Sequence, residues 1–201
     1  MFKVLRLSPL EPTKMIEVFA YWNPLGDGKY SRNGTLIVSG GCDTVVGNAI
    51  LKNPGSARPI KEEPAIWYGG RLPFRPDATM YALADLFELG KRPGTVRLFN
   101  LLDYVDTDPA KARVIGLLTS DDVLGTVTEG HVPTYIGWGD IWKDMSLTGF
   151  CEQIFNAVLP YSPYLSPEME KNVFLHPLYL MRYGRGRQIC EDMISSFSTL
   201  L

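Results

Sequence analysis

Residues 45–56 have the sequence VVGNAILKNPGS. Val45 to Leu51 is a mostly apolar run of the length of a buried strand, bounded by turn-forming residues. The run ends abruptly in Asn53-Pro54-Gly55, a combination that favours a turn. The stretch therefore predicts a buried strand that is followed by a polar turn at its carboxyl end.

Other segments of the chain show the same plan, in which short apolar runs and amphipathic helices lie between turns. Asp77 can cap a helix from Ala78 to Gly90, where apolar residues recur at helical spacing and Gly90 supplies the stop. We expect further strands at Val96 to Leu102, Val132 to Trp138 and Val173 to Leu175. We expect further helices at Ala110 to Leu118, Ile141 to Leu159 and Arg187 to Leu200.

Two segments fall outside this pattern, a predicted hairpin and a long loop. Residues 1–40 form a β-rich N-terminal extension, in which Met15 to Trp22 pairs with Tyr30 to Val38 through a turn at Asn23 to Gly28. Residues 57–76 show no regular period and predict a long loop, which in a compact domain is usually functional or disordered. The aromatic pair Trp67-Tyr68 argues against disorder, because disordered segments are poor in aromatic residues.

Strands that alternate with helices predict a sheet that is covered on both faces. We therefore expect a single α/β domain over residues 1–201, built as a three-layer α/β/α sandwich with a parallel-rich central sheet. A chain of 201 residues fits one domain of ordinary size. Hydrophobic residues at 45% and charged residues at 21% are typical of a globular protein and exclude a disordered chain.

The charge and the cysteine content restrict which binding partners and which cellular compartment the sequence predicts. A net charge of −2 provides no general attraction to nucleic acid, so binding to DNA would need a local basic patch. Three cysteines without a CxxC motif indicate reduced thiols in a cytoplasmic protein. Neither of the 2 histidines lies near a cysteine, so we expect no metal site and no cofactor. No signal peptide and no apolar run of about 20 residues is present, so we expect no membrane association, while the oligomeric state is not indicated.

Polar or turn-forming residues end three of the predicted strands: Asn53-Pro54-Gly55, Asn100 and His176. In open α/β sheets, ligands bind in the crevice beyond the carboxyl ends of the strands. Two carboxamides and an imidazole in that crevice could read the edge of a planar heterocycle, because an amide both donates and accepts hydrogen bonds. Each residue also has a purely structural interpretation. Asn53-Pro54-Gly55 could be a plain turn, Asn100 could cap the following loop, and His176 could bond a local carbonyl.

Five segments resemble, in the same order, the signature segments of a bacterial and phage family named domain of unknown function 1643. They are AILKNPGSA at 49–57, DATM at 77–80, LFNLLDY followed by TDP at 98–109, YIGWG at 135–139 and HPLY at 176–179. The resemblance extends from about residue 30 to residue 181. The chain departs from the family pattern at Gly55, where the family has serine, at Arg58, where it has aspartate, and in a longer loop before Asp77.

That family is itself similar to the uracil-DNA glycosylase fold, so the resemblance implies this fold and a site for a nucleobase. By the resemblance, Asn53 would orient an attacking water, Asn100 would read the base and His176 would stabilise the departing base anion. Cleavage of a glycosidic bond to a base needs charge stabilisation on the leaving group more than a strong nucleophile. Further substrate contacts would come from the same turn and from the HPLY segment: Pro54, Gly55, Ser56 and Tyr179.

Aromatic and basic residues near the predicted site could hold nucleic acid. Trp67 and Tyr68 could stack on a base, at about 1–3 kcal/mol each, or could cover the edge of the core. Arg182, Arg185 and Arg187 follow the His-Pro segment and could contact phosphates, or could belong to a solvated surface loop.

The sequence leads to three hypotheses for function. The first is recognition of a nucleobase in DNA or in a nucleotide, extending to excision of the base by hydrolysis of the N-glycosidic bond. The second is non-catalytic binding of a nucleotide or modified base, in a phage or bacterial defence context. The third is an enzyme that acts on another small molecule in the same crevice.

Overall fold

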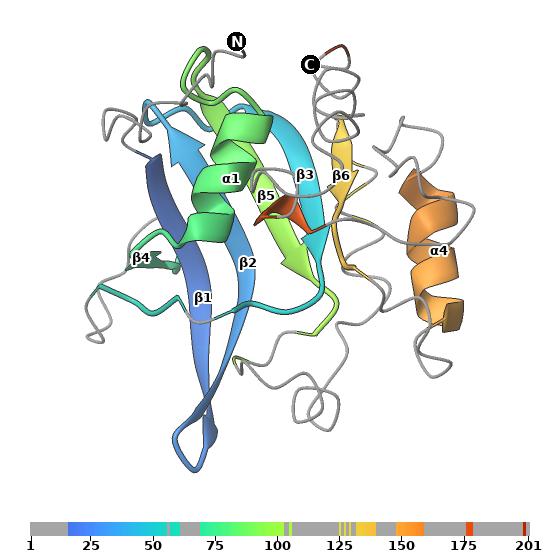
Figure 1. Ribbon diagram of the computed structural model, residues 1–201. Coiled ribbons are helices and arrows are strands. Elements are labelled where there is room, and N and C mark those ends of the chain that lie inside the picture. The colour runs from blue at the N-terminus through green and yellow to red at the C-terminus, as the bar shows by residue number, and fades with distance from the viewer. Residues whose placement is uncertain are drawn as a thin grey trace, which may run out of the picture.

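The computed structural model describes residues 16–55, 57–60, 69–102, 105, 125, 127, 129, 132–139, 148–158, 176–178 and 199. Within these residues the chain forms strands and helices that pack around one sheet (Figure 1). In chain order they are β1 (Ile16–Gly26), β2 (Lys29–Ser39), β3 (Val45–Leu51), β4 (Leu72–Phe74), α1 (Ala78–Leu86), β5 (Gly94–Asn100), β6 (Thr134–Ile136) and α4 (Thr148–Val158).

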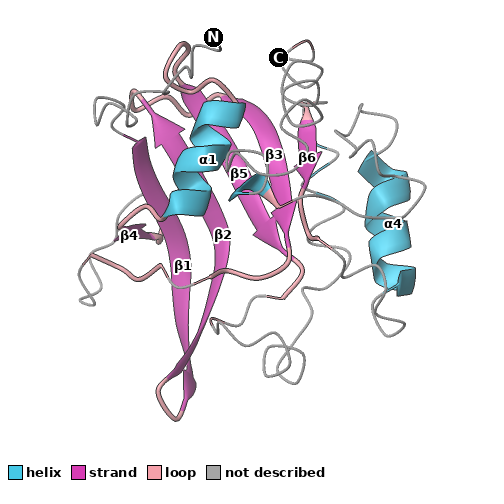
Figure 2. Cartoon of the chain, in the orientation of Figure 1, coloured by secondary structure: helices cyan, strands magenta, loops and turns pink. Residues whose placement is uncertain are grey.

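The strands form one mixed sheet in the order β4-β1-β2-β5-β3-β6 (Figure 2). β1 is antiparallel to β4 and β2, and β2 is antiparallel to β5. β3 is parallel to both of its neighbours, β5 and β6. The predicted α/β class is therefore confirmed, but the prediction of a parallel-rich sheet is wrong, because the described strands form a mixed sheet. The N-terminal hairpin joins the central sheet instead of standing apart from it, and it brings the antiparallel pairs.

The predicted N-terminal hairpin is confirmed, with strands that are longer than expected. β1 continues through Pro24, which pairs with Tyr30, so the turn shortens to Asp27-Gly28. Both turn residues have positive φ, 50° and 68°, a conformation that glycine adopts freely and that aspartate tolerates. The far end of the hairpin extends beyond the other strands (Figure 1).

The predicted loop at residues 57–76 contains a strand, which corrects part of that prediction. β4 pairs with β1 at the edge of the sheet, with Phe74 opposite Val18. Pro59 makes an isolated bridge to the same Phe74, so the loop returns to β4. A strand of three residues is too short to show an alternating pattern in the sequence, and a proline within it is tolerated at a sheet edge.

Helix α1 begins where the sequence predicts but ends earlier. Asp77 is the N-cap, and its Oδ1 accepts a hydrogen bond from the backbone N–H of Met80 at 3.0 Å. The predicted end at Gly90 is wrong, because the helix ends at Leu86 and its C-cap, Phe87, has a non-helical backbone with φ of −85° and ψ of 8°. The cap therefore fixes the start of α1 at a defined place beside the turn after β3.

Apolar side chains fill both faces of the sheet. Along β3 successive side chains alternate, so that Ala49 and Leu51 belong to one core cluster and Ile50 to the other. The side of the sheet that packs against α1 through Met80, Leu83 and Phe87 is called the α1 face. The opposite side, which packs against α4 through Cys151, Ile154 and Val158, is called the α4 face.

A glycine in β3 allows the C-terminal turn of α1 to press against the sheet. A Cβ atom placed on Gly47 would lie 2.0 Å from Cε1 of Phe87, far closer than two such atoms can approach. Phe87 is fully buried at this point. The contact sets the distance between α1 and the sheet, and with it the position of Asp77 at the other end of the helix.

The other predicted elements are shown in part. β5 spans Gly94–Asn100, which is shifted by two residues from the predicted 96–102, while β6 and α4 lie within the predicted ranges 132–138 and 141–159. The predicted helices at 110–118 and 187–200 and the strand at 173–175 lie outside the described residues. No helix in the described part of the chain is long and apolar enough to span a membrane.

Candidate functional site

The carboxyl ends of β3 and β5 bring the two predicted asparagines to one edge of the sheet. Leu51 pairs with Asn100 in parallel register, and the turn at Asn53 follows two residues later. Backbone bonds continue past the strands: the N–H of Leu101 donates to the carbonyl of Leu51, and that of Leu102 to Lys52, each at 2.9 Å. The turn after β3 and the last residue of β5 are therefore held side by side.

The Asn53-Pro54-Gly55 turn has a conformation that requires its glycine. Gly55 has φ of 69°, in the left-handed region that residues with a Cβ atom adopt at a cost. A Cβ there would lie 3.6 Å from Oδ2 of Asp77. The glycine at this position therefore has a structural reason in this chain. Ser56 lies outside the described residues.

Arg32 is a site residue that the sequence analysis missed. It lies on β2, is 2% exposed, and its guanidinium stands over the ring of Phe74, 5.7 Å from the centroid. Its Nη2 donates a hydrogen bond to the carbonyl of Pro54, which ties β2 to the turn after β3. Among the described residues, its Nε and Nη1 have no hydrogen-bond partner.

The surroundings of Arg32 are unfavourable to its charge. The pKa of its guanidinium is lowered to about 10, mainly because the side chain is buried. The carboxylate of Asp77 opposes this shift, and the positive charge of Arg58 adds to it by a smaller amount. A guanidinium with this pKa still carries its full charge at neutral pH. The site therefore contains a buried cation whose bonded partner is a neutral carbonyl.

Two further buried polar side chains on the α1 face have no partner in the part of the chain that the structure describes. Asn100 is 2% exposed, and neither its Oδ1 nor its Nδ2 is hydrogen-bonded. Alternation along β5 places Asn100 on the same face as Val96 and Leu98. Thr35, which pairs with Leu98, is 1% exposed, and its Oγ1 is also without a partner. Folded proteins rarely leave such groups unsatisfied, because each costs about 1–3 kcal/mol.

Asp77 adds the carboxylate of the site. The sequence predicts it only as a helix cap, a role that Oδ1 fills, while Oδ2 lies on the side of Gly55. Its charge acts on Arg32, although the two side chains form no ion pair. One carboxylate thus has two tasks, to begin α1 and to place a negative charge beside the turn.

His176 is half-buried and begins a short helical turn. Its Nδ1 accepts a hydrogen bond from the backbone N–H of Leu178 at 3.3 Å. In the neutral imidazole the proton is then carried on Nε2, which remains a donor. The strand pairings that bring Asn53 and Asn100 together do not include His176. The other predicted contact residues lie outside the described residues: Trp67, Tyr68, Tyr179, Arg182, Arg185 and Arg187.

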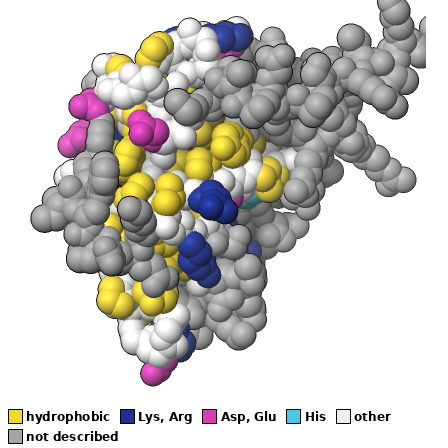
Figure 3. All heavy atoms as spheres, turned by 90° about the vertical axis from the view of Figure 1, so that its left-hand side faces the viewer, with side chains coloured by type: hydrophobic (Ala, Val, Ile, Leu, Met, Phe, Trp, Pro, Cys, Tyr) yellow, Lys and Arg dark blue, Asp and Glu magenta, His cyan; other side chains and the backbone are white. Residues whose placement is uncertain are grey.

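Aromatic rings and arginines gather where the hairpin meets β4. Trp22 stacks on Tyr30 with ring centroids 4.6 Å apart, and the guanidinium of Arg58 stands 5.6 Å from the centroid of Trp22. Arg71 stands 4.3 Å from the centroid of Tyr21. On this side of the molecule, Lys and Arg side chains lie among hydrophobic ones (Figure 3). Two arginines therefore lie against aromatic rings of the hairpin, although the chain as a whole has a net charge of −2.

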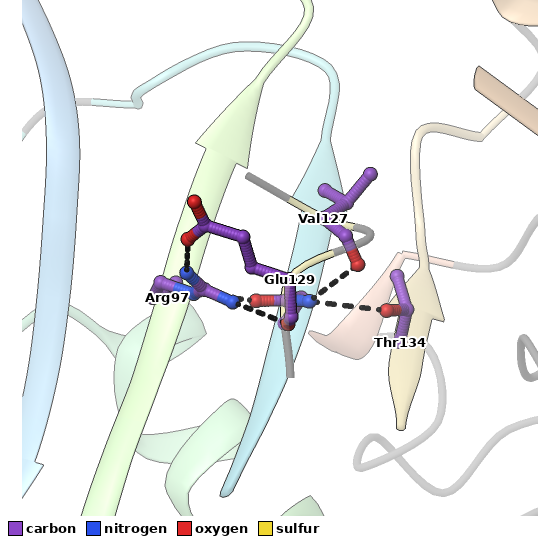
Figure 4. A network of polar contacts seen from close by, with 5 residues as sticks. Arg97, Val127, Glu129 and Thr134 are labelled. Carbon is purple, nitrogen blue, oxygen red and sulfur yellow. Dashed lines mark hydrogen bonds and ion pairs between the residues drawn. The ribbon is translucent and has the colours of Figure 1, made fainter. Parts of the chain in front are cut away.

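The α4 face carries a polar network of a different kind (Figure 4). Asn48 is fully buried, accepts a hydrogen bond from Nε of Arg97 at 2.9 Å, and donates to the carbonyl of Val127 and to Oγ1 of Thr134. Arg97 in turn binds the carboxylate and the carbonyl of Glu129. Both the oxygen and the nitrogen of the Asn48 side chain are thus hydrogen-bonded, and the network joins β3, β5 and β6 to Val127 and Glu129.

The chain matches no protein-family model, no curated protein and no solved structure. Its function is therefore argued from the chemistry of the α1-face site at the ends of β3 and β5.

Proposed function

We propose that the protein binds a nucleobase, carried on a nucleotide or in DNA, at the carboxyl edge of β3 and β5. The observation that carries the proposal is the amide of Asn100, which is buried and has neither its donor nor its acceptor bonded among the described residues. The edge of a nucleobase presents donors and acceptors side by side, which is the pattern that a carboxamide matches.

The residues around Asn100 support a ligand that is polar and planar. The turn at Asn53 lies beside it, and Arg32 and Thr35 supply further unbonded donors on the same face. Buried hydrogen bonds discriminate strongly between ligands, because a ligand that lacks the matching group leaves the protein atoms unpaired. Such a site selects among bases more than it selects among apolar molecules.

We further propose that the domain is a three-layer α/β/α sandwich similar to the uracil-DNA glycosylase fold. The support is that apolar clusters occupy both faces of the sheet, with α1 on one and α4 on the other. The sequence resemblance to the family named domain of unknown function 1643 points the same way. In this proposed fold, the central sheet is mixed and includes the two hairpin strands β1 and β2.

N-glycosidic cleavage is the second candidate function, and two observations favour it. The Nδ1 of His176 accepts a hydrogen bond from Leu178, so the neutral imidazole carries its proton on Nε2, and an N–H donor is the group that suits a departing base anion. The carboxylate of Asp77 lies beside the Asn53-Pro54-Gly55 turn, where a water that attacks the sugar would be held. If cleavage does not occur, the site acts as a non-catalytic binder of a nucleotide or modified base.

The test is a calorimetric titration with a panel of nucleosides and nucleotides. Asn100→Asp should change which base binds best, because it replaces the donor of the amide by an acceptor. Asn156→Asp makes the same substitution at an exposed position of α4 and should leave the preference unchanged. Equal affinity of the Asn100→Asp protein and the parent for every base would contradict the proposal.

Catalysis is tested separately. The protein is incubated with DNA and with nucleotides, and free base is measured by chromatography. Release that is lost in His176→Gln would establish the glycosidic activity. Binding without release would establish the non-catalytic alternative.

A further inference from the structure

We propose that Arg32 holds a phosphate group of the ligand, so that the protein binds nucleotides in preference to free bases and nucleosides. The choice of a nucleobase rests on the proposed function, whereas the phosphate position rests on Arg32 and its neighbours. The two parts can therefore fail separately.

The first argument is the unbalanced charge of Arg32. The side chain is 2% exposed, and its one hydrogen bond to a described residue goes to the uncharged carbonyl of Pro54. No acidic residue in the described part of the chain forms an ion pair with it. A buried charge without a counterion is among the most costly features of a folded protein, and an anionic ligand would remove that cost.

The second argument is the local balance of charges. Arg58 adds a positive charge that acts on Arg32, and Asp77 is the opposing carboxylate. Oδ1 of Asp77 is already engaged in capping α1. Asp77 acts on Arg32 more strongly than Arg58 does, but the two arginines and this one carboxylate still carry a combined formal charge of +1, which favours an anion over a neutral group.

The third argument is the number of unbonded donors on the α1 face. Nε and Nη1 of Arg32, the hydroxyl of Thr35 and the amide nitrogen of Asn100 are all buried and without partners in the described residues. Donors outnumber the acceptors that a base edge alone would supply. A phosphate group, with its several oxygen acceptors, matches a guanidinium and a hydroxyl, and arginine binds such groups with strong charge-assisted bonds.

The experiment compares four probes on the full chain by titration calorimetry. They are inorganic phosphate, one nucleoside, its 5′-monophosphate and a short single-stranded oligonucleotide that contains the same base. The monophosphate should bind about tenfold or more tightly than the nucleoside, and phosphate alone should raise the melting temperature. Tighter binding of the oligonucleotide than of the monophosphate would identify a nucleic-acid strand as the source of the phosphate, and the reverse would identify a free nucleotide.

Variants separate Arg32 from general charge effects. Arg32→Met should abolish the advantage of the monophosphate over the nucleoside, which is measured as the ratio of the two affinities within the same variant. Arg92→Met removes the same charge on the surface near α1 and should keep the full advantage. If Arg32→Met does not fold, Arg32→Lys replaces it, and the lysine should reduce the advantage without reversing it.

The titration results distinguish failure of the phosphate position from failure of the proposed function. Equal affinity of nucleoside and monophosphate for the parent protein would overturn the phosphate position while the proposed function stands. Failure of every base-containing probe, together with stabilisation by phosphate that depends on Arg32, would overturn the proposed function and support the anion site. No response to any probe, phosphate included, would overturn both.

Discussion

Asn48 and Asn100 lie on the adjacent strands β3 and β5, are both buried, and face opposite sides of the sheet. Asn48, on the α4 face, is 0% exposed and has both amide atoms hydrogen-bonded. Asn100, on the α1 face, is 2% exposed, and neither amide atom has a partner among the described residues. The same side chain is thus fully hydrogen-bonded on one face of the sheet and without a partner among the described residues on the other.

This contrast predicts opposite effects of the same substitution. Asn48→Leu should lower the free energy of unfolding by about 2–4 kcal/mol, because it removes the partner that Asn48 provides to Nε of Arg97 and to the carbonyl of Val127. Asn100→Leu should raise the free energy of unfolding, or leave it within about 1 kcal/mol, because it removes an unsatisfied buried group. Urea unfolding of the two variants measures the difference, and a destabilisation of Asn100→Leu as large as that of Asn48→Leu would show that Asn100 is structural.

Asp77 combines a cap with a charge, and two substitutions separate them. Asp77→Ala should lower the free energy of unfolding by about 1 kcal/mol through loss of the cap, whereas Asp77→Asn should lower it much less, since asparagine also caps helices. Asp77→Asn should also tighten phosphate binding, because it removes the negative charge that acts on Arg32. Thermal unfolding and phosphate titration check the two effects. Weaker phosphate binding in Asp77→Asn would mean that its carboxylate positions the site in another way.

The turn after β3 depends on the positive φ of Gly55. Gly55→Ala should lower the free energy of unfolding by about 1 kcal/mol, because a Cβ atom disfavours this conformation. Gly149, in α4, has ordinary φ and open space around it, so Gly149→Ala should raise stability by a few tenths of a kcal/mol. Chemical denaturation of both variants provides the comparison, and equal effects at the two positions would contradict the role assigned to the turn.

The affinity for a nucleoside monophosphate should depend on pH in two stages. It should rise between about pH 5 and 7, as the phosphate loses its second proton with a pKa of about 6. It should then stay level and fall above pH 10, because the pKa of Arg32 is about 10 and its positive charge is lost above that value. A base that does not ionise near pH 10 should be used. Arg32→Met should bind weakly and show no fall at high pH, and an alkaline fall that persists in this variant would assign it to another group.

Binding to DNA is a prediction from the arginines at 182, 185 and 187. Replacing each by alanine should weaken binding similarly for all sequences and should reduce the slope of log affinity against log salt by about one. Replacing Asn100 should abolish base preference and leave the salt slope nearly unchanged. Titrations at several salt concentrations measure both quantities. Absence of affinity for single- and double-stranded DNA at low salt would leave a nucleotide or another metabolite as the ligand.

The parts of the fold that could be predicted from sequence have local signals. The bounds of β3 follow from an apolar run that ends in Asn53-Pro54-Gly55, and the start of α1 follows from the capping side chain of Asp77. The end of α1 could not be predicted, because the contact of Phe87 with Gly47 is a tertiary contact. β4 could not be predicted either, since its three residues form a strand only by pairing with β1.

Part of the candidate site has a sequence signal of the same local kind. Asn53 and Asn100 could be proposed as candidates because each stands at or just after the carboxyl end of a strand, which is where parallel sheets bind ligands. Arg32 stands in the first half of β2 and is invisible to that rule. Because β2 is antiparallel to β5, with Thr35 opposite Leu98, the beginning of β2 lies beside the end of β5. In a mixed sheet, candidate site residues can therefore stand at the beginning of an antiparallel strand as well as at the end of a parallel one.

The antiparallel pairing of β2 with β5 also bears on the order of events when the chain folds. The β1–β2 hairpin joins residues that are close in the sequence, but the pairing of Thr35 with Leu98 closes a long loop that contains β3, β4 and α1. Contacts of long sequence separation form late, because closing the loop costs conformational entropy before the contacts that it brings together can offset that cost. Arg32, the turn after β3 and Asn100 meet only when β5 has docked between β2 and β3. A ligand of this site therefore binds the fully folded chain alone, and it should stabilise the whole domain against unfolding and proteolysis instead of ordering one segment.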